Sequence, residues 1–329
     1  MTELNLTLAC LPYDRFQPLL SGEIPVDGAR VAPVPLRWPI EVFSRMLAHN
    51  EFDIAEMSIV HSFVYTAKRT AQFSVLPIFP SRMFRHGFIF INKTAGIRSP
   101  RDLAGRRIGI QGHQTAASIW IRGILRSDYG VDFDNVSWFE GGVNQKGLKG
   151  GHITMLKPRH PPRTQPLRDD QMLSDMLATG EIDALISPEI PASLRTSDNV
   201  ERLFPDYQAE EKSYFARTGI FPIMHTLVIR KELHEQQPWL AASLYKACDA
   251  AKALALKQAR YSGAPAYMLP WMFKELEEMD AVFGADPWPY GLAPNRTALE
   301  TVQRFLVEES FLDEPMRIDD VFLPAGDPR

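Results

Sequence analysis

The stretch from residue 76 to residue 89 gathers residue types that bind and protonate organic anions. It reads LPIFPSRMFRHGFI and sets Arg82, Arg85 and His86 where one apolar run ends and another begins, as in a strand, a loop and a second strand. Arginine matches carboxylate geometry with two parallel hydrogen bonds, and histidine carries a proton near neutral pH. The stretch therefore predicts a cationic site with phenylalanine walls that suits a planar anion. Surface arginines and a histidine held in a turn are the alternative.

Another candidate follows the first predicted strand. Residues 4 to 9 alternate apolar and polar side chains, and Tyr13 comes in the loop directly after them. In an open α/β sheet, ligands bind beyond the carboxyl ends of the strands. We therefore expect Tyr13 near the ligand, with a solvated helix start as the alternative.

A sequence echo suggests that the chain contains two similar halves. The pattern MLAxxExD occurs at residues 46–53 and again at residues 176–183, each time before a short apolar run. Each copy predicts a helix end, a tight turn and a strand, and the first strand delivers Glu56, Ser58 and His61. Two lobes built on one plan is our interpretation, and a chance match is the alternative.

A third group of polar residues opens a predicted helix. His113, Gln114 and Thr115 follow the short predicted strand 108–110 and precede a helix that runs through Trp120. Free backbone N–H groups at a helix start attract anions. The turn thus predicts a second part of the ligand site, although glycine-containing turns of this kind are common.

The bulk properties are those of an ordinary globular protein. The chain has 329 residues, enough for two domains, with 45% hydrophobic and 23% charged residues. A net charge of -4 provides no broad field for nucleic acid or an anionic membrane. Cys10 and Cys248 lack the spacing of a disulfide framework or a thiolate metal site.

The first residues do not have the pattern of an export signal. The start MTELNLTLAC alternates like a strand and lacks a basic region, a long apolar core and a cleavage site. No window has the roughly 18 uncharged apolar residues of a membrane span. We expect a cytoplasmic protein. Residues 139–170 form a basic loop rich in glycine and proline, to which we assign no role.

These segments resemble one family, the bacterial 4,5-dihydroxyphthalate decarboxylases, which are similar in fold to type II periplasmic binding proteins. The most specific motifs are FPSRMFRH at 79–86 and TGIFPIMH at 218–225, and matching segments cover almost the whole chain. The resemblance implies an α/β fold of two lobes around a ligand cleft. The first lobe would hold residues 1–92 and 226–329, and the second lobe residues 93–225.

The resemblance also implies a carboxy-lyase that removes one of two adjacent ring carboxylates without oxidation, converting 4,5-dihydroxyphthalate to protocatechuate and carbon dioxide. Arg82 and Arg85 would then hold the carboxylates, and His86 or His225 would protonate the ring. Glu56 would be a base or would orient a histidine, and a buried ion pair with an arginine is the alternative. The substrate-binding residues that we expect are Tyr13, Ser58, Ser81, Arg82, Arg85, His113, Gln114 and Thr115.

The expected ligand is a small aromatic carboxylate, and no cofactor is required. A divalent cation held by Glu56, His61, His86 and His225 is the alternative. Neither nucleic acid nor a membrane is an expected partner, and self-association stays open. The competing function is a solute-binding protein that captures an aromatic carboxylate without chemistry, because one fold serves many functions.

Overall fold

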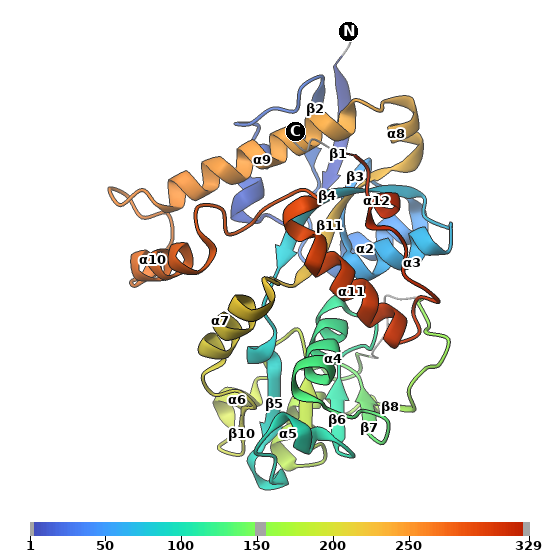
Figure 1. The fold of residues 1–329 in the computed structure, drawn as a ribbon, viewed down its shortest axis with the longest axis vertical. Helices are drawn as coiled ribbons and strands as arrows, with labels where there is room; N and C mark the ends of the chain where they lie inside the picture. Colours follow the sequence, from blue (N-terminus) through green and yellow to red (C-terminus); the bar gives the residue numbers. More distant parts are fainter. Residues whose placement is uncertain (1–2, 149–155, 325–329) are drawn as a thin grey trace. The chain divides into compact units, whose positions relative to one another are not determined.

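The computed structural model describes residues 3–148 and 156–324, so residues 149–155 of the basic loop lie outside the described part. The chain forms two compact units, each built on its own sheet (Figure 1). The first unit contains Met1–Arg82, Ile223–Leu299 and Met316–Arg329, and the second contains Met83–Pro222 and Glu300–Pro315. No helix in the described residues is long and apolar enough to cross a membrane.

The sheet of the first unit has the strand order β2-β1-β3-β11-β4. Strands β2, β1 and β3 are parallel, and β11 is antiparallel to both β3 and β4. The carboxyl ends of β1, β3 and β4 and the start of β11 therefore share one edge of the sheet. The bounds are β1 Leu4–Ala9, β2 Ala29–Pro33, β3 Ile54–Ser58, β4 Phe73–Arg82 and β11 Ile223–Arg230.

The sheet of the second unit has the order β10-β5-β9-β6-β7-β8. Strands β9, β6, β7 and β8 are parallel, and β5 is antiparallel to β9 and β10. The bounds are β5 Ile89–Asn92, β6 Arg107–Ile110, β7 Ser137–Glu140, β8 Thr164–Pro166, β9 Ala184–Ile186 and β10 Val200–Arg202. The run β7-β6-β9-β5-β10 repeats the order and directions of β2-β1-β3-β11-β4, which confirms that both units follow one plan.

The two copies of the sequence echo have the same local structure. Helix α2, Pro39–His49, ends at Asn50 with φ 48°, and helix α5, Leu173–Thr179, ends at Gly180 with φ 79°. A left-handed residue after the last turn stops the helix and redirects the chain, and Gly or Asn is favoured there. The following strand then enters the middle of each sheet.

The aspartate of each copy links this strand to its parallel neighbour by a hydrogen bond. Asp53 Oδ2 accepts a hydrogen bond of 2.9 Å from the Thr7 N–H of β1, and Asp183 Oδ2 accepts one of 2.9 Å from the Arg107 N–H of β6. On the other side of each strand, the backbone carbonyl of the aspartate accepts a hydrogen bond from the antiparallel neighbour. The Arg230 N–H donates to Asp53 at 2.8 Å, and the Asn92 N–H donates to Asp183 at 2.9 Å. The echo therefore marks equivalent positions in the two sheets.

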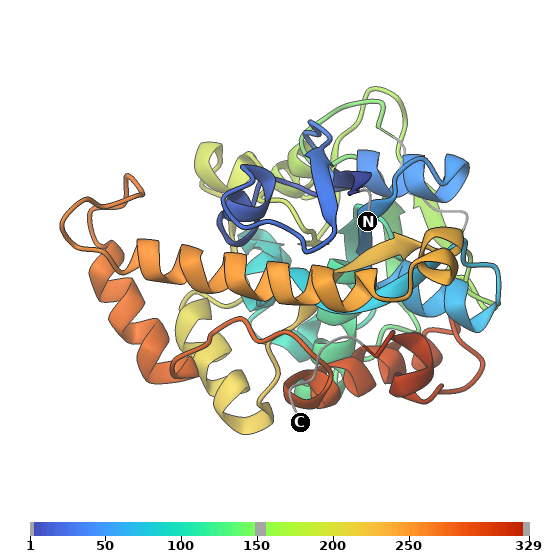
Figure 2. The same ribbon diagram turned by 90° about the horizontal axis from the view of Figure 1, so that it is seen from above.

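Helices cover the sheets and supply most of the packing. In the first unit, α9, Leu240–Ala259, packs on α1, Gln17–Leu20, and on the short 3-10 helix η1, Asp14–Phe16, and a loop joins α9 to α10, Met272–Phe283 (Figure 2). The other α-helices are α3 Ile59–Ala67, α4 Ala116–Tyr129, α6 Ser193–Thr196, α7 Tyr207–Thr218, α8 Lys231–Gln236, α11 Arg296–Glu308 and α12 Ile318–Val321.

Both faces of the second sheet are buried. Successive side chains of a strand point to opposite faces, so neighbouring residues of β5 belong to different apolar clusters. Ile89 and Ile91 of β5 belong to one apolar cluster, and Phe90 between them belongs to the other. Gly109 of β6 allows close packing, because a Cβ there would lie 2.7 Å from Ile182 Cδ1 and 2.8 Å from Leu173 Cδ2.

The unit boundaries differ from the boundaries expected near Asn92 and His225. Strand β5, Ile89–Asn92, pairs with β9 and β10, so it belongs to the second sheet. Residues 300–315, expected in the first lobe, belong to the second unit. There Phe305 meets Trp120 edge to face, with 5.6 Å between the ring centroids.

Candidate active site

Four sequence-predicted residues lie at the edge of the first sheet where β1 and β3 end and β11 begins. In the antiparallel register, His225 lies opposite Ser58, and Leu227 lies opposite Glu56. Residues two apart in a strand share a face. Glu56, Ser58 and His225 therefore project to the same side, and Tyr13 approaches from the loop after β1.

Glu56 is the centre of this group. Its Oε1 lies 2.5 Å from His225 Nδ1 and accepts a hydrogen bond of 2.7 Å from the Tyr13 hydroxyl. Its Oε2 accepts from the Leu11 N–H at 3.1 Å and from the Cys10 thiol at 3.7 Å. Glu56 is fully buried, so these donors replace the water that a carboxylate would otherwise bind.

Opposing effects set the charge of Glu56. Burial by itself raises the pKa of the carboxyl, but the charge and hydrogen bond of His225, with the bonds from Tyr13 and the Leu11 N–H, outweigh burial and leave the pKa below its ordinary value. Burial and the nearby Glu56 charge raise the pKa of Tyr13. The arrangement is an ionised carboxylate held by a protonated phenol and an imidazole.

His225 is partly exposed and can meet a ligand. Its side chain is 15% exposed, whereas that of Glu56 is 0% exposed. Because Nδ1 faces Glu56, Nε2 is the nitrogen left for a substrate. An imidazole oriented by a buried carboxylate can act as a general acid or base.

Two neighbours of this group were not predicted as site residues. The Arg15 guanidinium lies 4.3 Å from the centroid of the Tyr13 ring and 4.1 Å from that of Trp288, and its Nε donates to the Pro80 carbonyl at 2.7 Å. Cys10 contacts Glu56. Cys10 and Arg15 lie before and after Tyr13 in the sequence, just past β1. This position after a strand was the signal that could have identified them as site residues. Cysteine spacing, which indicates only disulfides and metal sites, could not identify Cys10.

His61 lies nearby in the same unit, on α3. It is 3% exposed, and its ring centroid is 6.2 Å from those of Phe43 and Tyr65. Phe43 also contacts His225 edge to face, with 5.0 Å between the centroids. Within the described residues, neither ring nitrogen of His61 has a hydrogen-bond partner. Burial, with the charge of His225, lowers the pKa of His61 to about 4, so it is neutral at pH 7.

Arg82 and Ser81 lie at the end of β4. Ser81 is opposite His225 in the sheet, but the Arg82 guanidinium is buried and donates to the Pro289 carbonyl at 2.7 Å and to the Asn295 side-chain oxygen. Burial lowers the pKa of Arg82 to about 9. The structure thus ties Arg82 to protein oxygens within its own unit.

Arg85 and His86 belong to the second unit, so the predicted cationic motif is divided between the units. His86 is 2% exposed, and its ring centroid lies 5.3 to 6.0 Å from those of Tyr214, Phe204 and Tyr129. Burial lowers the pKa of His86 to about 4. The Arg85 guanidinium lies over the Phe88 ring of the same unit, and burial lowers the pKa of Arg85 to about 10.

The predicted turn before α4 is present in the second unit. Thr115 caps the helix by accepting from the Ser118 N–H at 3.2 Å, and Gln114 is buried. His113 Nε2 lies 3.0 Å from Thr164 Oγ1, and burial together with Arg122 lowers the His113 pKa to about 2. Thr115 and His113 therefore have structural contacts within the unit.

The four candidate metal ligands are divided between the two units. Glu56, His61 and His225 lie in the first unit, whereas His86 lies in the aromatic cluster of the second. Among residues 3–148 and 156–324, no group of three or more His, Cys, Asp or Glu side chains is placed to hold a metal ion.

Comparison with known proteins identifies relatives of this chain. It is 36% identical over 333 residues to the 4,5-dihydroxyphthalate decarboxylase of Comamonas testosteroni, covering 99% of this chain and 98% of that protein. It is also 36% identical to the enzyme of the same name from Pseudomonas putida, over 65% of this chain and 83% of that protein.

Broader comparisons agree in fold. The NMT1/THI5-like family model matches residues 44–153. The periplasmic aliphatic sulphonate binding protein SsuA of Escherichia coli superposes with a TM-score of 0.56 at 12% identity, covering 100% of this chain and 94% of that one. The fold is therefore the two-sheet α/β fold of periplasmic binding proteins, and by its full-length relative the chain belongs to the 4,5-dihydroxyphthalate decarboxylase family.

Proposed function

We propose that this protein decarboxylates 4,5-dihydroxyphthalate without oxidation, giving protocatechuate and carbon dioxide. The observation that carries the proposal is the Tyr13–Glu56–His225 group, which combines a buried carboxylate with a partly exposed imidazole at 2.5 Å. It occurs in a chain that matches a 4,5-dihydroxyphthalate decarboxylase over nearly its full length. The group supplies the proton transfer that such a reaction needs.

The substrate makes decarboxylation by proton transfer feasible. Each ring hydroxyl is para to one of the two carboxylates, so its electrons can be delivered to the ring carbon that bears that carboxylate. Protonation of this carbon interrupts the aromatic ring. Cleavage of the bond to the carboxylate then releases carbon dioxide, and the electron pair of that bond restores aromaticity. The net change is the replacement of carbon dioxide by a proton.

We assign the proton transfer to His225. Glu56 fixes the imidazole ring through Nδ1, so Nε2 can donate to the ring carbon of the substrate as a general acid and recover a proton from solvent. Glu56 is 0% exposed, so its role is to position and charge-balance His225 rather than to contact the substrate. His86, neutral and enclosed by aromatic rings, is the weaker candidate for the acid.

Carboxylate binding by Arg82 and Arg85 stays a prediction. So do the contacts assigned to Ser58, Ser81 and Gln114. These residues contact the substrate only if it binds next to the strand ends and the helix start at which they lie. Bidentate arginine contacts would neutralise the two adjacent carboxylates, which repel each other in the free dianion.

The test is incubation of the chelator-treated protein with 4,5-dihydroxyphthalate while carbon dioxide and the ring absorption spectrum are followed, with and without added divalent cations. We expect turnover in both conditions. Turnover only with a cation would support the metal alternative. Binding of the compound without carbon dioxide release in either condition would contradict the proposal and favour a solute-binding protein.

Variants connect the activity to the group. Glu56→Gln keeps the size of the side chain but removes its charge, so we expect kcat/KM to fall by on the order of 10²-fold with an unchanged circular dichroism spectrum. The matched control is Glu51→Gln. Glu51 lies just before β3, and its exposed carboxylate pairs with Arg45. Equal activity of the two variants would remove Glu56 from the mechanism.

A further inference from the structure

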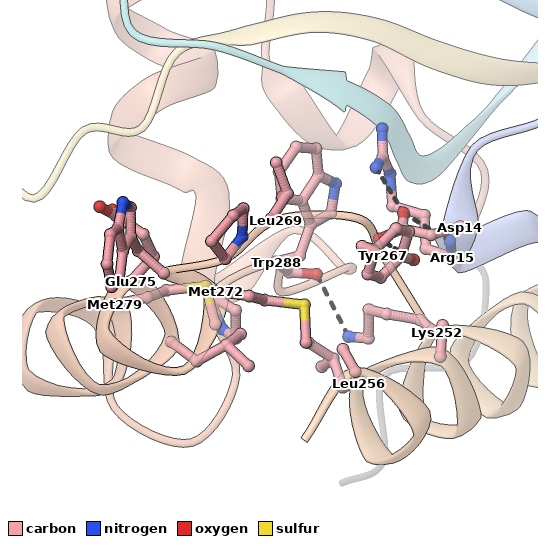
Figure 3. A pocket seen from close by; sticks show the side chains of 16 residues that line it. Asp14, Arg15, Lys252, Leu256, Tyr267, Leu269, Met272, Glu275, Met279 and Trp288 are labelled. Atoms are coloured by element: carbon pink, nitrogen blue, oxygen red, sulfur yellow. Dashed lines mark hydrogen bonds and ion pairs between the residues drawn. The ribbon is translucent and has the colours of Figure 1, made fainter. Parts of the chain in front are cut away.

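The first unit contains a cavity of about 680 Å³ between the end of α9, the loop after it, α10 and the Trp288 segment (Figure 3). Glu56 and His225 are not part of its wall. Its volume is that of a typical small-molecule site. The lining residues are Asp14, Arg15, Lys252, Ala255, Leu256, Ala259, Tyr267, Leu269, Pro270, Trp271, Met272, Glu275, Leu276, Met279, Pro287 and Trp288.

The wall is mainly apolar, and it includes three aromatic and two thioether side chains. Trp271 and Trp288 supply indole rings, Met272 and Met279 supply thioether groups, and Figure 3 shows Trp288 and both methionines among the side chains of the wall. Methionine sulfur makes favourable contacts with aromatic rings and adapts to ligands of irregular shape. Aromatic faces favour offset or edge-to-face contact with another ring. This wall therefore suits an aromatic ligand.

Both cations of the wall, Arg15 and Lys252, are already paired with protein groups. Lys252 Nζ donates to Asp286 at 2.6 Å and to the Trp288 carbonyl at 3.2 Å. Arg15 Nη1 lies 3.0 Å from Asp14 Oδ1, and the Tyr267 hydroxyl donates to Asp14 Oδ2 at 3.2 Å. An anionic ligand would have to displace these internal acceptors. Charge complementarity therefore favours an uncharged ligand, unlike the dianionic phthalate.

The mouth of the cavity carries unusually exposed apolar side chains. Trp271 is 77% exposed and Leu269 is 63% exposed, although both contribute to the wall. Adjacent large apolar groups at a surface usually mark a binding site. A ligand in the cavity would remove part of this surface from water, which is favourable at about 25 cal/mol per Å².

We propose that this cavity binds one neutral aromatic molecule at a site separate from the Tyr13–Glu56–His225 group. The wall favours aromatic rings, the pairing of its cations disfavours anions, and the volume accommodates two or three fused or linked rings. Binding at this site does not depend on the decarboxylation proposed above. It is tested without turnover.

The experiment compares two fluorescent probes that share one skeleton. N-phenyl-1-naphthylamine is neutral, and 8-anilinonaphthalene-1-sulfonate adds a sulfonate to it. We expect the neutral probe to bind the native protein saturably, with one molecule per chain, and at least fivefold more tightly than the sulfonate. Tighter binding of the sulfonate, or the absence of saturable binding, would overturn the proposal.

Two variants on α9 locate the probe. Ala259→Trp fills the cavity, whereas Ala253→Trp places the same side chain on the exposed side of the same helix. We expect Ala259→Trp to weaken binding of the neutral probe at least tenfold and Ala253→Trp to change it less than twofold. Equal effects would show that the probe binds elsewhere and would refute the site.

A further variant covers the case in which Ala259→Trp does not fold. Met279→Gln keeps the side-chain length and makes the wall more polar, so it should also weaken the neutral probe. Sedimentation velocity distinguishes a small-molecule site from contact between two copies of the chain. A dimer that Trp271→Ser dissociates, together with failure of the monomer to bind the probe, would replace the proposal with self-association.

Discussion

The pKa of Glu56 depends on individual donors, and Tyr13 is the one that can be removed with the least change in shape. Its hydroxyl contacts Oε1, the same oxygen that faces His225. A hydrogen bond to a charged group is worth about 1.5–3 kcal/mol. Each bond of this kind holds the carboxylate in the form that orients the imidazole.

We expect Tyr13→Phe to shift the acid limb of the kcat/KM profile to higher pH by about one unit. The Tyr13 hydrogen bond lowers the pKa of Glu56, so its loss raises that pKa, and Glu56 becomes protonated at a higher pH. Protonated Glu56 no longer balances the charge of His225. The measurement is initial rate against pH, and KM at the optimum should change little.

Tyr267→Phe is the matched control, because this hydroxyl contacts Asp14 instead of Glu56. Its profile should superimpose on that of the native protein. An unshifted acid limb in Tyr13→Phe would mean that Glu56 does not control the protonation step.

At the scale of elements, Arg82 links the end of β4 to the segment before α11. Arg82→Met should lower the free energy of unfolding of the first unit by about 1–3 kcal/mol, because buried acceptors at Pro289 and Asn295 lose a charged donor. Urea unfolding monitored by tryptophan fluorescence measures the effect. Arg45→Met, which removes two partly exposed ion pairs and a contact with the Phe52 ring, should change stability less. Equal stability of the variants would leave Arg82 available for substrate binding.

The helix ends of the two echo copies predict a second effect at this scale. Gly180 has φ 79°, and an added Cβ would lie 3.6 Å from Asn92 Nδ2, an ordinary contact. Gly180→Ala should therefore cost about 1–2 kcal/mol of unfolding free energy through backbone strain alone. Gly180→Asn should cost less, because Asn50 adopts this conformation in the first copy. Native stability of Gly180→Ala, measured by thermal unfolding, would contradict the assignment.

For the whole molecule, three buried histidines predict loss of stability in mild acid. Burial lowers the pKa of His61 and His86 to about 4 and that of His113 to about 2. Between pH 6.5 and 4 the unfolded chain binds protons that the folded chain does not. The free energy of unfolding therefore falls as the pH falls, by about 1.4 kcal/mol per pH unit for each fully neutral histidine.

Glu211 changes the pH dependence of stability in the opposite direction. Burial raises its pKa to about 7, so its contribution to the free energy of unfolding is lost as the pH rises toward that value. Chemical unfolding at pH 7, 6 and 5, followed by circular dichroism, measures the balance. His86→Phe fits the aromatic cluster and should reduce the slope of stability against pH by up to about 1.4 kcal/mol per unit. A slope equal to that of the native protein would contradict a buried neutral His86.

Several features of this protein follow from local sequence pattern. The repeated MLAxxExD motif predicted two matching helix–turn–strand units, because helix ends and strand starts are encoded by neighbouring residues. Tyr13 and Glu56 were recognised because polar side chains just past or within short apolar runs stand out. The motifs around Arg82 and His225 were specific enough to indicate the family.

Which of these residues come into contact depends on the fold. Glu56 and His225 are 169 positions apart, and they pair because β11 returns antiparallel to β3 in one register. The chain also passes from one unit to the other after Arg82, which divides a motif that looked like a single cationic site. Pairing register and the path between units depend on packing of distant segments, so no local pattern encodes them.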